Sequence, residues 1–292
     1  MAHSLSLLQR ATDVVREPYP HIIVENALPS GLYDELAESF PQPSAMEVDP
    51  TGNNRRWDYP ARKVVDNKSI PELWRRFIAY NSSQEFFNDI VALFQDSIIA
   101  LYPDRFPDRA SLQALKIGMR DLDRFGRKDV LIESMISGNT PVTAASSVRT
   151  THVDAGNKLF SGLFYMRRPD DTSMGGDLTI SRFIERYRGQ DERFTLFTGP
   201  YVDDSHVEVV RTVPYAANTL VLFINSLDSL HGVTVRSETP HPRLFVNLVG
   251  EVDDRLYRLY GMDNAKAPHY VPNTLPRQIR RKLVNFGRVL AA

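Results

Sequence analysis

The chain has 292 residues, of which 42% are hydrophobic, so it can form one large domain or two modest ones with a packed core. Its 35 Lys and Arg residues and 36 Asp and Glu residues give a net charge of −1, which excludes a chain-wide attraction to nucleic acid or to an anionic membrane. Cysteine is absent, which excludes disulfides, thiolate metal sites and cysteine nucleophiles. Any metal ion must therefore be bound by His and carboxylate side chains.

The first residues show no basic start followed by an apolar run of signal-peptide length. No stretch of the sequence approaches the about 18 consecutive apolar residues of a membrane-spanning helix. We therefore expect a cytoplasmic protein without a transmembrane segment.

The first third of the chain, residues 1–111, is predicted to be a support region of helices and a short strand. The segment HIIVENAL has the composition of a strand and is followed by an amphipathic helical pattern. Ser69 with Glu72, and Ser82 with Glu85, have capping-box spacing ahead of apolar runs. This spacing predicts that two helices begin there.

From residue 112 to residue 255 the apolar pattern becomes that of strands, many of them alternating. Turn signals separate about eight or nine such segments, and no helical pattern lies between them, which favours a jelly roll over a parallel α/β sheet. We predict a mainly β (α+β) fold, a cupin-like double-stranded β-helix at 112–255 braced by the helical region, in one compact domain overall. The strand-like segments are ALKIGMR, DVLIESMIS, SSVRTTHVD, LFSGLFYMR, GDLTISRF, EVVRTVPY, NTLVLFIN, HGVTV and PRLFVNLVGEV.

The last part, residues 256–292, is predicted to be an extension that ends in a basic helix. Ile279, Leu283 and Phe286 recur on one face of the segment PRQIRRKLVNF. We expect this helix to dock on its own barrel, and peripheral contact with an anionic membrane surface is the alternative.

The segment THVDAGNKLF carries a candidate metal site. In an extended chain His152 and Asp154 point to the same face, so both can bind one ion. His231, which begins the strand-like segment HGVTV, would complete a set of two imidazoles and one carboxylate. Three such ligands leave three positions of an octahedral ion open, which suits iron(II), although the set alone does not exclude zinc.

A second histidine and carboxylate pair, His206 and Glu208, competes for the same role but lies in a charged stretch that has the composition of an insertion loop. Arg243 favours the first set, because it opens the strand RLFVNLVGE and would place a cation in the barrel. Its planar guanidinium can bind a carboxylate through two hydrogen bonds, and the natural candidate is the distal carboxylate of 2-oxoglutarate. Asn247 follows on the same face of that strand.

The motifs HVD, LFYM, GGDL, FIN, HGV and RLFVNLVGE, in this order, resemble the prolyl-4-hydroxylase-like branch of the iron(II)- and 2-oxoglutarate-dependent oxygenases. The resemblance covers about residues 112–252. It implies that His152, Asp154 and His231 bind iron, and that Arg243, with Tyr165 and Asn247, binds 2-oxoglutarate. Ile136 stands where some prolyl hydroxylases carry a tyrosine, which counts against prolyl substrates.

The predicted activity is hydroxylation of an unactivated C–H bond of a small polar or anionic metabolite, such as an amino acid or a sugar acid. Iron(II), 2-oxoglutarate and O2 would be required, with ascorbate as a candidate reductant, and Arg149 is a candidate substrate contact. Three alternatives stay open: a hydroxylase of prolyl or other protein side chains, a metal-dependent cupin enzyme, and a non-catalytic small-acid sensor. The sequence indicates no nucleic-acid partner and no oligomeric state.

Overall fold

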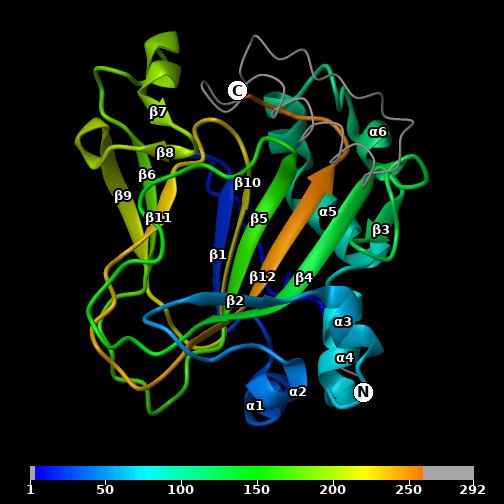
Figure 1. Ribbon diagram of the computed structural model, residues 1–292. Helices are drawn as coiled ribbons and strands as arrows, with labels where there is room; N and C mark the ends of the chain where they lie inside the picture. Colours follow the sequence, from blue (N-terminus) through cyan, green and yellow to red (C-terminus); the bar gives the residue numbers. More distant parts are fainter. Residues whose placement is uncertain (1–3, 259–292) are drawn as a thin grey trace, which may run out of the picture.

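Two facing β-sheets form the centre of the computed structural model, which describes residues 4–258 (Figure 1). The larger, seven-stranded sheet has the order β1-β10-β5-β12-β4-β2 with β3 beside β4, and the smaller sheet has the order β11-β6-β9. Neighbouring strands are antiparallel except for β3 and β4. The strands are β1 (His21–Glu25), β2 (Arg56–Tyr59), β3 (Ile117–Met119), β4 (Val130–Asn139), β5 (Lys158–Tyr165), β6 (Leu178–Phe183), β9 (Val207–Val213), β10 (Thr219–Ile224), β11 (His231–Val233) and β12 (Arg243–Val252).

The extended segment around His152 completes the smaller sheet, because His152 forms an antiparallel bridge with His231 at the start of β11. From β4 to β12 the chain passes back and forth between two layers. One layer is β4-β12-β5-β10, and the other is the His152 segment followed by β11-β6-β9. This is the strand order of a double-stranded β-helix, so the predicted jelly roll is confirmed.

Alternate residues of the larger sheet face different layers, as the pleat of a strand requires. On β5, Phe160 and Phe164 belong to one hydrophobic cluster with Phe77 of α4 and Phe94 of α5. Tyr165, which points the other way, packs with residues of β6 in the smaller sheet. Helices therefore cover one face of the larger sheet, and the other face points toward the smaller sheet (Figure 1).

Segments from the first third of the chain also extend the larger sheet, since β1 pairs with β10 and β2 pairs with β4. No helix within residues 4–258 is both long and apolar enough to cross a membrane. The basic helix predicted near the C-terminus lies outside the described residues. The helices are α1 (Ser30–Glu38), α2 (Pro43–Met46), α3 (Ala61–Asp66), α4 (Glu72–Tyr80), α5 (Gln84–Leu101) and α6 (Arg109–Gln113), with short 3-10 turns η1 (Asp191–Leu196) and η2 (Asp204–His206) between β6 and β9.

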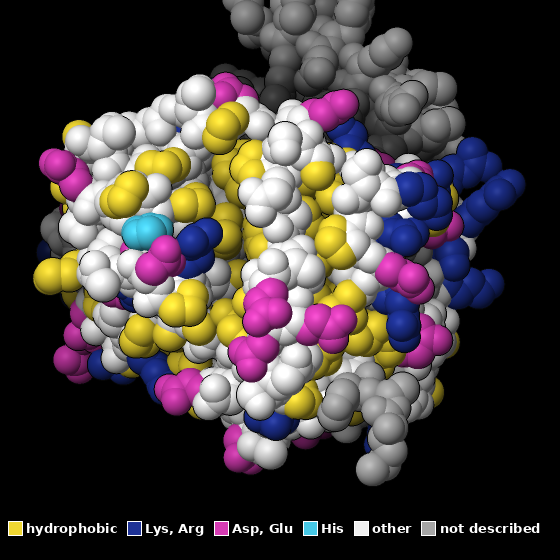
Figure 2. All heavy atoms as spheres, turned by 90° about the horizontal axis from the view of Figure 1, so that it is seen from below, with side chains coloured by type: hydrophobic (Ala, Val, Ile, Leu, Met, Phe, Trp, Pro, Cys, Tyr) yellow, Lys and Arg dark blue, Asp and Glu magenta, His cyan; other side chains and the backbone are white. Residues whose placement is uncertain are grey.

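The surface seen from below carries charges of both signs among apolar and uncharged side chains (Figure 2). Lys and Arg side chains gather toward the right-hand edge of this view, and acidic side chains lie among them. No single sign dominates this face, in line with the net charge of −1.

Two helix starts differ slightly from the predicted capping boxes. α4 begins at Glu72 after Pro71, and Ser69 caps nothing there. α5 begins at Gln84, and its N-cap is Ser83, whose side chain accepts a hydrogen bond from the Phe86 amide. The capping-box pattern located α5 within one residue because adjacent serines offer equivalent hydroxyls.

Replacing Ser83 by alanine should lower the free energy of unfolding by about 1 kcal/mol, because an amide of the first turn of α5 loses its acceptor. Ser69→Ala is the matched control, since that exposed serine caps no helix, and it should change stability by less than about 0.5 kcal/mol. Urea denaturation measures both. Equal losses in the two variants would contradict the assignment of the cap.

Candidate metal centre

The structure brings His152, Asp154 and His231 together. Each offers one ligand atom, and these atoms lie within 4.8 Å of one another. The two histidines are directly paired across neighbouring strands, with ring centroids 4.2 Å apart, and Asp154 follows in the same extended segment. All three side chains are buried. Within residues 4–258 this is the one such group of three His, Asp or Glu side chains able to hold a metal ion.

Backbone carbonyls fix the orientation of both imidazoles. His152 Nδ1 lies 2.8 Å from the Thr150 carbonyl oxygen, and His231 Nδ1 lies 2.9 Å from that of Ser229. A carbonyl oxygen can only accept, so Nδ1 donates in each case and the Nε2 lone pair is left for a metal ion. Burial lowers the pKa of His152 to about 2 and also lowers that of His231, so both rings are neutral at physiological pH.

Asp154 is held as an anion. Burial alone would raise its pKa, but the charge of Lys158 and the hydrogen bond from Ser161 help to offset this, and the pKa lies below its usual value. One carboxylate oxygen accepts a 2.6 Å hydrogen bond from Ser161, which in turn accepts one from Asn225. Two neutral imidazoles and one oriented carboxylate in a buried position fit a divalent transition-metal ion.

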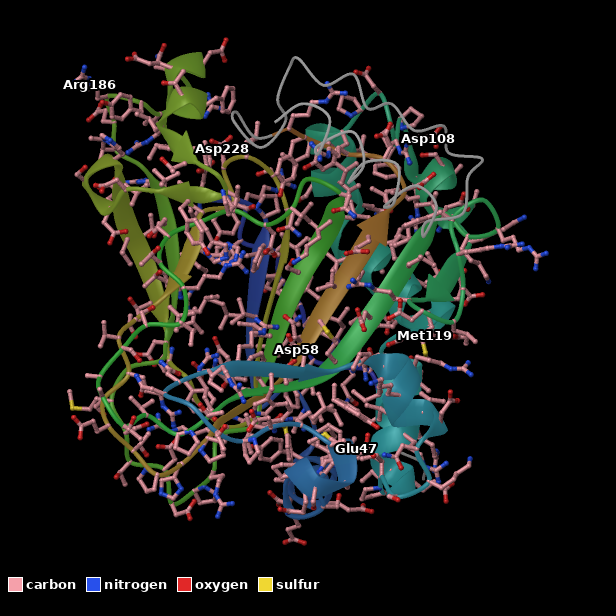
Figure 3. The ribbon with its side chains drawn as sticks, in the orientation of Figure 1. Glu47, Asp58, Asp108, Met119, Arg186 and Asp228 are labelled. Atoms are coloured by element: carbon pink, nitrogen blue, oxygen red, sulfur yellow. The ribbon has the colours of Figure 1, made fainter. Side chains whose placement is uncertain are left out.

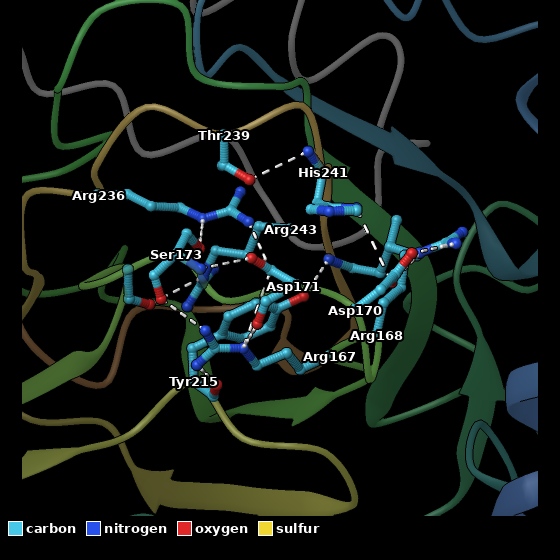
Figure 4. A network of polar contacts seen from close by, with 12 residues as sticks. Arg167, Arg168, Asp170, Asp171, Ser173, Tyr215, Arg236, Thr239, His241 and Arg243 are labelled. Atoms are coloured by element: carbon cyan, nitrogen blue, oxygen red, sulfur yellow. Dashed lines mark hydrogen bonds and ion pairs between the residues drawn. The ribbon is translucent and has the colours of Figure 1, made fainter.

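Arg243, which lies beside Arg236 in Figure 4, opens β12 and is buried, as is Tyr165 of β5 in the space between the sheets. Its Nε donates to the Gly176 carbonyl at 2.8 Å and its Nη2 to the Tyr165 hydroxyl at 3.2 Å. Its guanidinium lies 5.0 Å from the ring centroids of Tyr165, Tyr215 and Phe245. Arg243 is therefore oriented from several sides.

The same space connects Arg243 with the triad. Phe223 packs 4.7 Å from the His231 ring and belongs to one hydrophobic cluster with Tyr165 and Phe245. Asn247 lies on the same face of β12 as Arg243 and is partly exposed, opposite Met135 and Leu163. Apolar, mostly aromatic side chains thus line the space between the triad and Arg243.

The Gly175–Gly176 turn is needed for this arrangement. Both glycines have a φ of +76°, and a Cβ on Gly175 would lie 1.9 Å from the Val235 carbonyl oxygen. No other residue fits so close to a neighbouring backbone. The turn therefore contributes to the site, since it aims the Gly176 carbonyl at Arg243.

A buried ion pair lies next to Arg243. Arg236 Nη2 is 2.7 Å from Asp171 Oδ2, its Nε donates to Ser173 at 3.1 Å, and both charged side chains are 0–1% exposed (Figure 4). The Arg236 guanidinium also lies over the Tyr215 ring that Arg243 contacts. This pair joins the loop after β5 to the segment between β11 and β12.

Replacing Asp171 by asparagine should lower the free energy of unfolding by about 3 kcal/mol at pH 7, because Arg236 would stay buried without a counter-charge. Burial alone would raise the pKa of Asp171, but hydrogen bonds from Ser173 and the charge of Arg236 hold it below its usual value. A depressed pKa adds stability above the unfolded-state pKa of about 4 and loses it as the pH falls.

The difference between Asp171→Asn and the unmodified protein should therefore shrink as the pH falls below about 4. Asp170→Asn is the adjacent control, since Asp170 forms an ion pair with Arg168 that is exposed to solvent and therefore contributes little to stability. Chemical denaturation at several pH values measures both effects. A pH-independent difference would contradict the role of the buried charge.

The rival pair from the sequence is not brought together with His231. Glu208 is exposed and paired with Arg182 at 2.6 Å and Arg188 at 2.9 Å, while the His206 ring packs on Tyr187.

Arg149 reaches the triad, with Nη1 3.8 Å from Asp154 Oδ1. Sequence reasoning missed Lys158, whose Nζ is 3.2 Å from the same oxygen, and Ser161. Strand alternation could have found Ser161, which shares a face of β5 with Tyr165.

No family model matches the sequence, and no curated protein matches it. Among solved structures, the chain is similar to a Pseudomonas putida prolyl-4-hydroxylase, with 14% identity over 80% of this chain and 92% of that one and a TM-score of 0.42. A Trichoplax adhaerens prolyl hydroxylase in complex with a hypoxia inducible factor peptide has 11% identity, covers 80% and 84%, and gives 0.40. EctD from S. alaskensis, solved with 2-oxoglutarate and 5-hydroxyectoine, has 12% identity, covers 80% and 72%, and gives 0.39.

The strand order and the triad are observations on this chain itself, and they stand apart from these distant likenesses. The chain thus combines a double-stranded β-helix with a buried group of two imidazoles and one carboxylate.

Proposed function

We propose that this protein is an iron(II)- and 2-oxoglutarate-dependent oxygenase that hydroxylates an unactivated C–H bond of a small polar or anionic substrate. One observation carries the proposal: the buried triad and the Arg243–Tyr165 pair face the same space between the two sheets. A metal site alone would suit many enzymes. A buried guanidinium beyond it supplies the second half of a site for a dicarboxylic acid that chelates the metal.

His152, Asp154 and His231 would hold the iron and leave three coordination positions open. When bound, iron(II) and 2-oxoglutarate supply the oxidising chemistry, in which dioxygen is reduced and the cosubstrate becomes succinate and carbon dioxide. The protein's share is to fix the ligands, to neutralise charge and to exclude water. The hydrogen bonds of the imidazoles to backbone carbonyls, and of Asp154 to Ser161, serve the first of these tasks.

Arg243 would bind the distal carboxylate of 2-oxoglutarate through its planar fork. Tyr165 would add a second donor: its oxygen already accepts from Arg243, which leaves its own proton free. Burial raises the pKa of Tyr165, so the hydroxyl keeps that proton. Asn247, on the same face of β12, would add a polar contact beside the cosubstrate, and Arg149 a contact with the substrate.

The test is succinate formation from 2-oxoglutarate by the purified protein with iron(II), ascorbate and O2, in the presence of a panel of amino acids and sugar acids. The proposal expects 2-oxoglutarate to be consumed in amounts that depend on iron. Turnover of a substrate with iron but without any use of 2-oxoglutarate would instead indicate a cupin-type metalloenzyme. A cytoplasmic location is part of the proposal, because 2-oxoglutarate and reduced iron are available there.

A further inference from the structure

The smaller sheet continues past the triad into the insertion between β6 and β9. There β7 (Phe197–Thr198) and β8 (Tyr201–Val202) form a hairpin. The Val202 amide donates to the Thr151 carbonyl at 3.1 Å, and the Val153 amide donates to the Pro200 carbonyl at 3.0 Å. β8 is therefore the next strand beyond the His152 segment, on the side opposite β11.

The hairpin is firmly attached to the barrel. Thr151 Oγ1 donates to Asp204 at 2.9 Å, and Arg193 of η1 forms an ion pair with Asp228 at 2.8 Å. Asp228, labelled in Figure 3, lies in the turn that leads to His231, below the insertion. Phe197 and Val202 are buried in a cluster with Val153, Phe183, Tyr187, Leu230 and Tyr257. The position of the hairpin relative to the triad is therefore fixed.

Tyr201 ends a row of side chains that contains both metal-binding imidazoles. His152 is bridged to Tyr201 on one side and to His231 on the other, and residues bridged in an antiparallel pair share a face. The Tyr201 ring centroid is 5.9 Å from that of His152. Yet Tyr201 is 41% exposed, whereas His152 is 2% exposed. A partly solvent-exposed aromatic ring thus lies beside a buried histidine of the triad.

Two cations reach the triad at Asp154. Lys158 Nζ and Arg149 Nη1 lie 3.2 Å and 3.8 Å from one oxygen of Asp154, and their side chains are 21% and 37% exposed. Asp154 is a single carboxylate, and its other oxygen accepts from Ser161. When Asp154 Oδ1 binds a divalent ion, the single negative charge of Asp154 is shared by that ion, Arg149 and Lys158. The surroundings of Asp154 then carry an excess of positive charge.

We propose that Tyr201, Arg149 and Lys158 form the subsite that binds the substrate through a carboxylate, with the Tyr201 ring against the planar or apolar group next to it. The proposal rests on the function proposed above, because it places the substrate beside an ion held by the triad. It narrows the substrate class to organic carboxylic acids. It also gives the insertion a role, which is to carry one wall of this subsite.

The experiment uses the full chain with Mn(II) and saturating 2-oxoglutarate, and two acid and amide pairs as probes: phenylacetate with phenylacetamide, and hexanoate with hexanamide. Bound Mn(II) accelerates the NMR relaxation of probe protons held near it. Both acids should bind, and each should bind about tenfold more tightly than its amide, as expected for a hydrogen bond between charged groups. The double variant Arg149→Gln, Lys158→Gln should lose this preference. Tyr201→Ala should weaken binding of phenylacetate, and Tyr201→Phe should retain it.

Arg182→Gln is the matched control, because Arg182 forms an exposed ion pair with Glu208 away from the triad. The Mn(II) affinity of every variant is measured first by electron paramagnetic resonance. If His231→Ala leaves Mn(II) binding intact, the proposed function fails and the subsite falls with it. If the triad binds Mn(II) but the amides bind as well as the acids, neither acid binds, or the double variant keeps the preference, the subsite alone is overturned.

Discussion

Replacement of His231 by alanine should abolish iron(II) binding and 2-oxoglutarate turnover together. The loss of a partner that merely orients a ligand costs roughly 10–100-fold in metal affinity or activity, so the loss of a ligand should cost more than about 100-fold. Anaerobic titration with cobalt(II), whose visible spectrum reports the ligand set, measures the affinity. Succinate formation measures the turnover.

The fold should survive this change, because His231 starts a short strand whose backbone hydrogen bonds do not depend on its side chain. His206→Ala is the matched control, since the sequence offered His206 as a rival ligand and the structure places it on Tyr187 instead. The control should bind cobalt(II) like the unmodified protein. If both variants keep full affinity, the metal does not bind at the triad.

Replacement of Arg243 by methionine should raise the KM for 2-oxoglutarate by about 30-fold or more, corresponding to at least about 2 kcal/mol for a buried charge pair that loses one partner. Methionine keeps much of the apolar contact with the rings of Tyr165, Tyr215 and Phe245 but removes the fork. Initial rates of succinate formation at several 2-oxoglutarate concentrations give the KM.

Two comparisons separate this effect from a general loss of structure. Cobalt(II) affinity should stay unchanged in Arg243→Met, because none of the metal-binding side chains is altered. The KM of Arg243→Lys for 2-oxoglutarate should lie between those of the unmodified protein and Arg243→Met, since lysine restores the charge but not the planar geometry. An unchanged KM in Arg243→Met would show that the distal carboxylate binds elsewhere, and would favour an enzyme that does not use 2-oxoglutarate.

Patterns within single strands were predicted well. Alternating apolar residues located β3 to β6 and β9 to β12, whereas the predicted strand SSVRTTHVD forms only isolated bridges, at Ser146 and His152. The two-residue spacing of His152 and Asp154 predicted that both lie on one face. The same alternation put Arg243 and Asn247 on one face of β12. These relations depend only on the pleat of an extended chain, which is the same in every strand.

Which face of a strand packs against the helices, and which points toward the smaller sheet, was harder to predict. Ile136 stands where some prolyl hydroxylases carry a tyrosine, and the sequence alone does not show which face of its strand it occupies. The structure buries Ile136 fully in the cluster between the larger sheet and the helices, and its neighbour Met135 lies on the other face. The alternation of β4 is visible in the sequence, but which face turns toward the helices is decided by the packing of the whole sheet.

The sequence by itself determined the class of fold, and it predicted the candidate metal ligands and an arginine suited to a carboxylate, because residue type and strand periodicity are local properties. Only the tertiary structure decided which distant side chains meet. The pairing of His152 with both His231 and Tyr201, the burial of Arg236 with Asp171, and the approach of Lys158 to Asp154 follow from strand order and loop path. Strand order is set by the burial of complete sheets and helices against one another, and no local pattern encodes it.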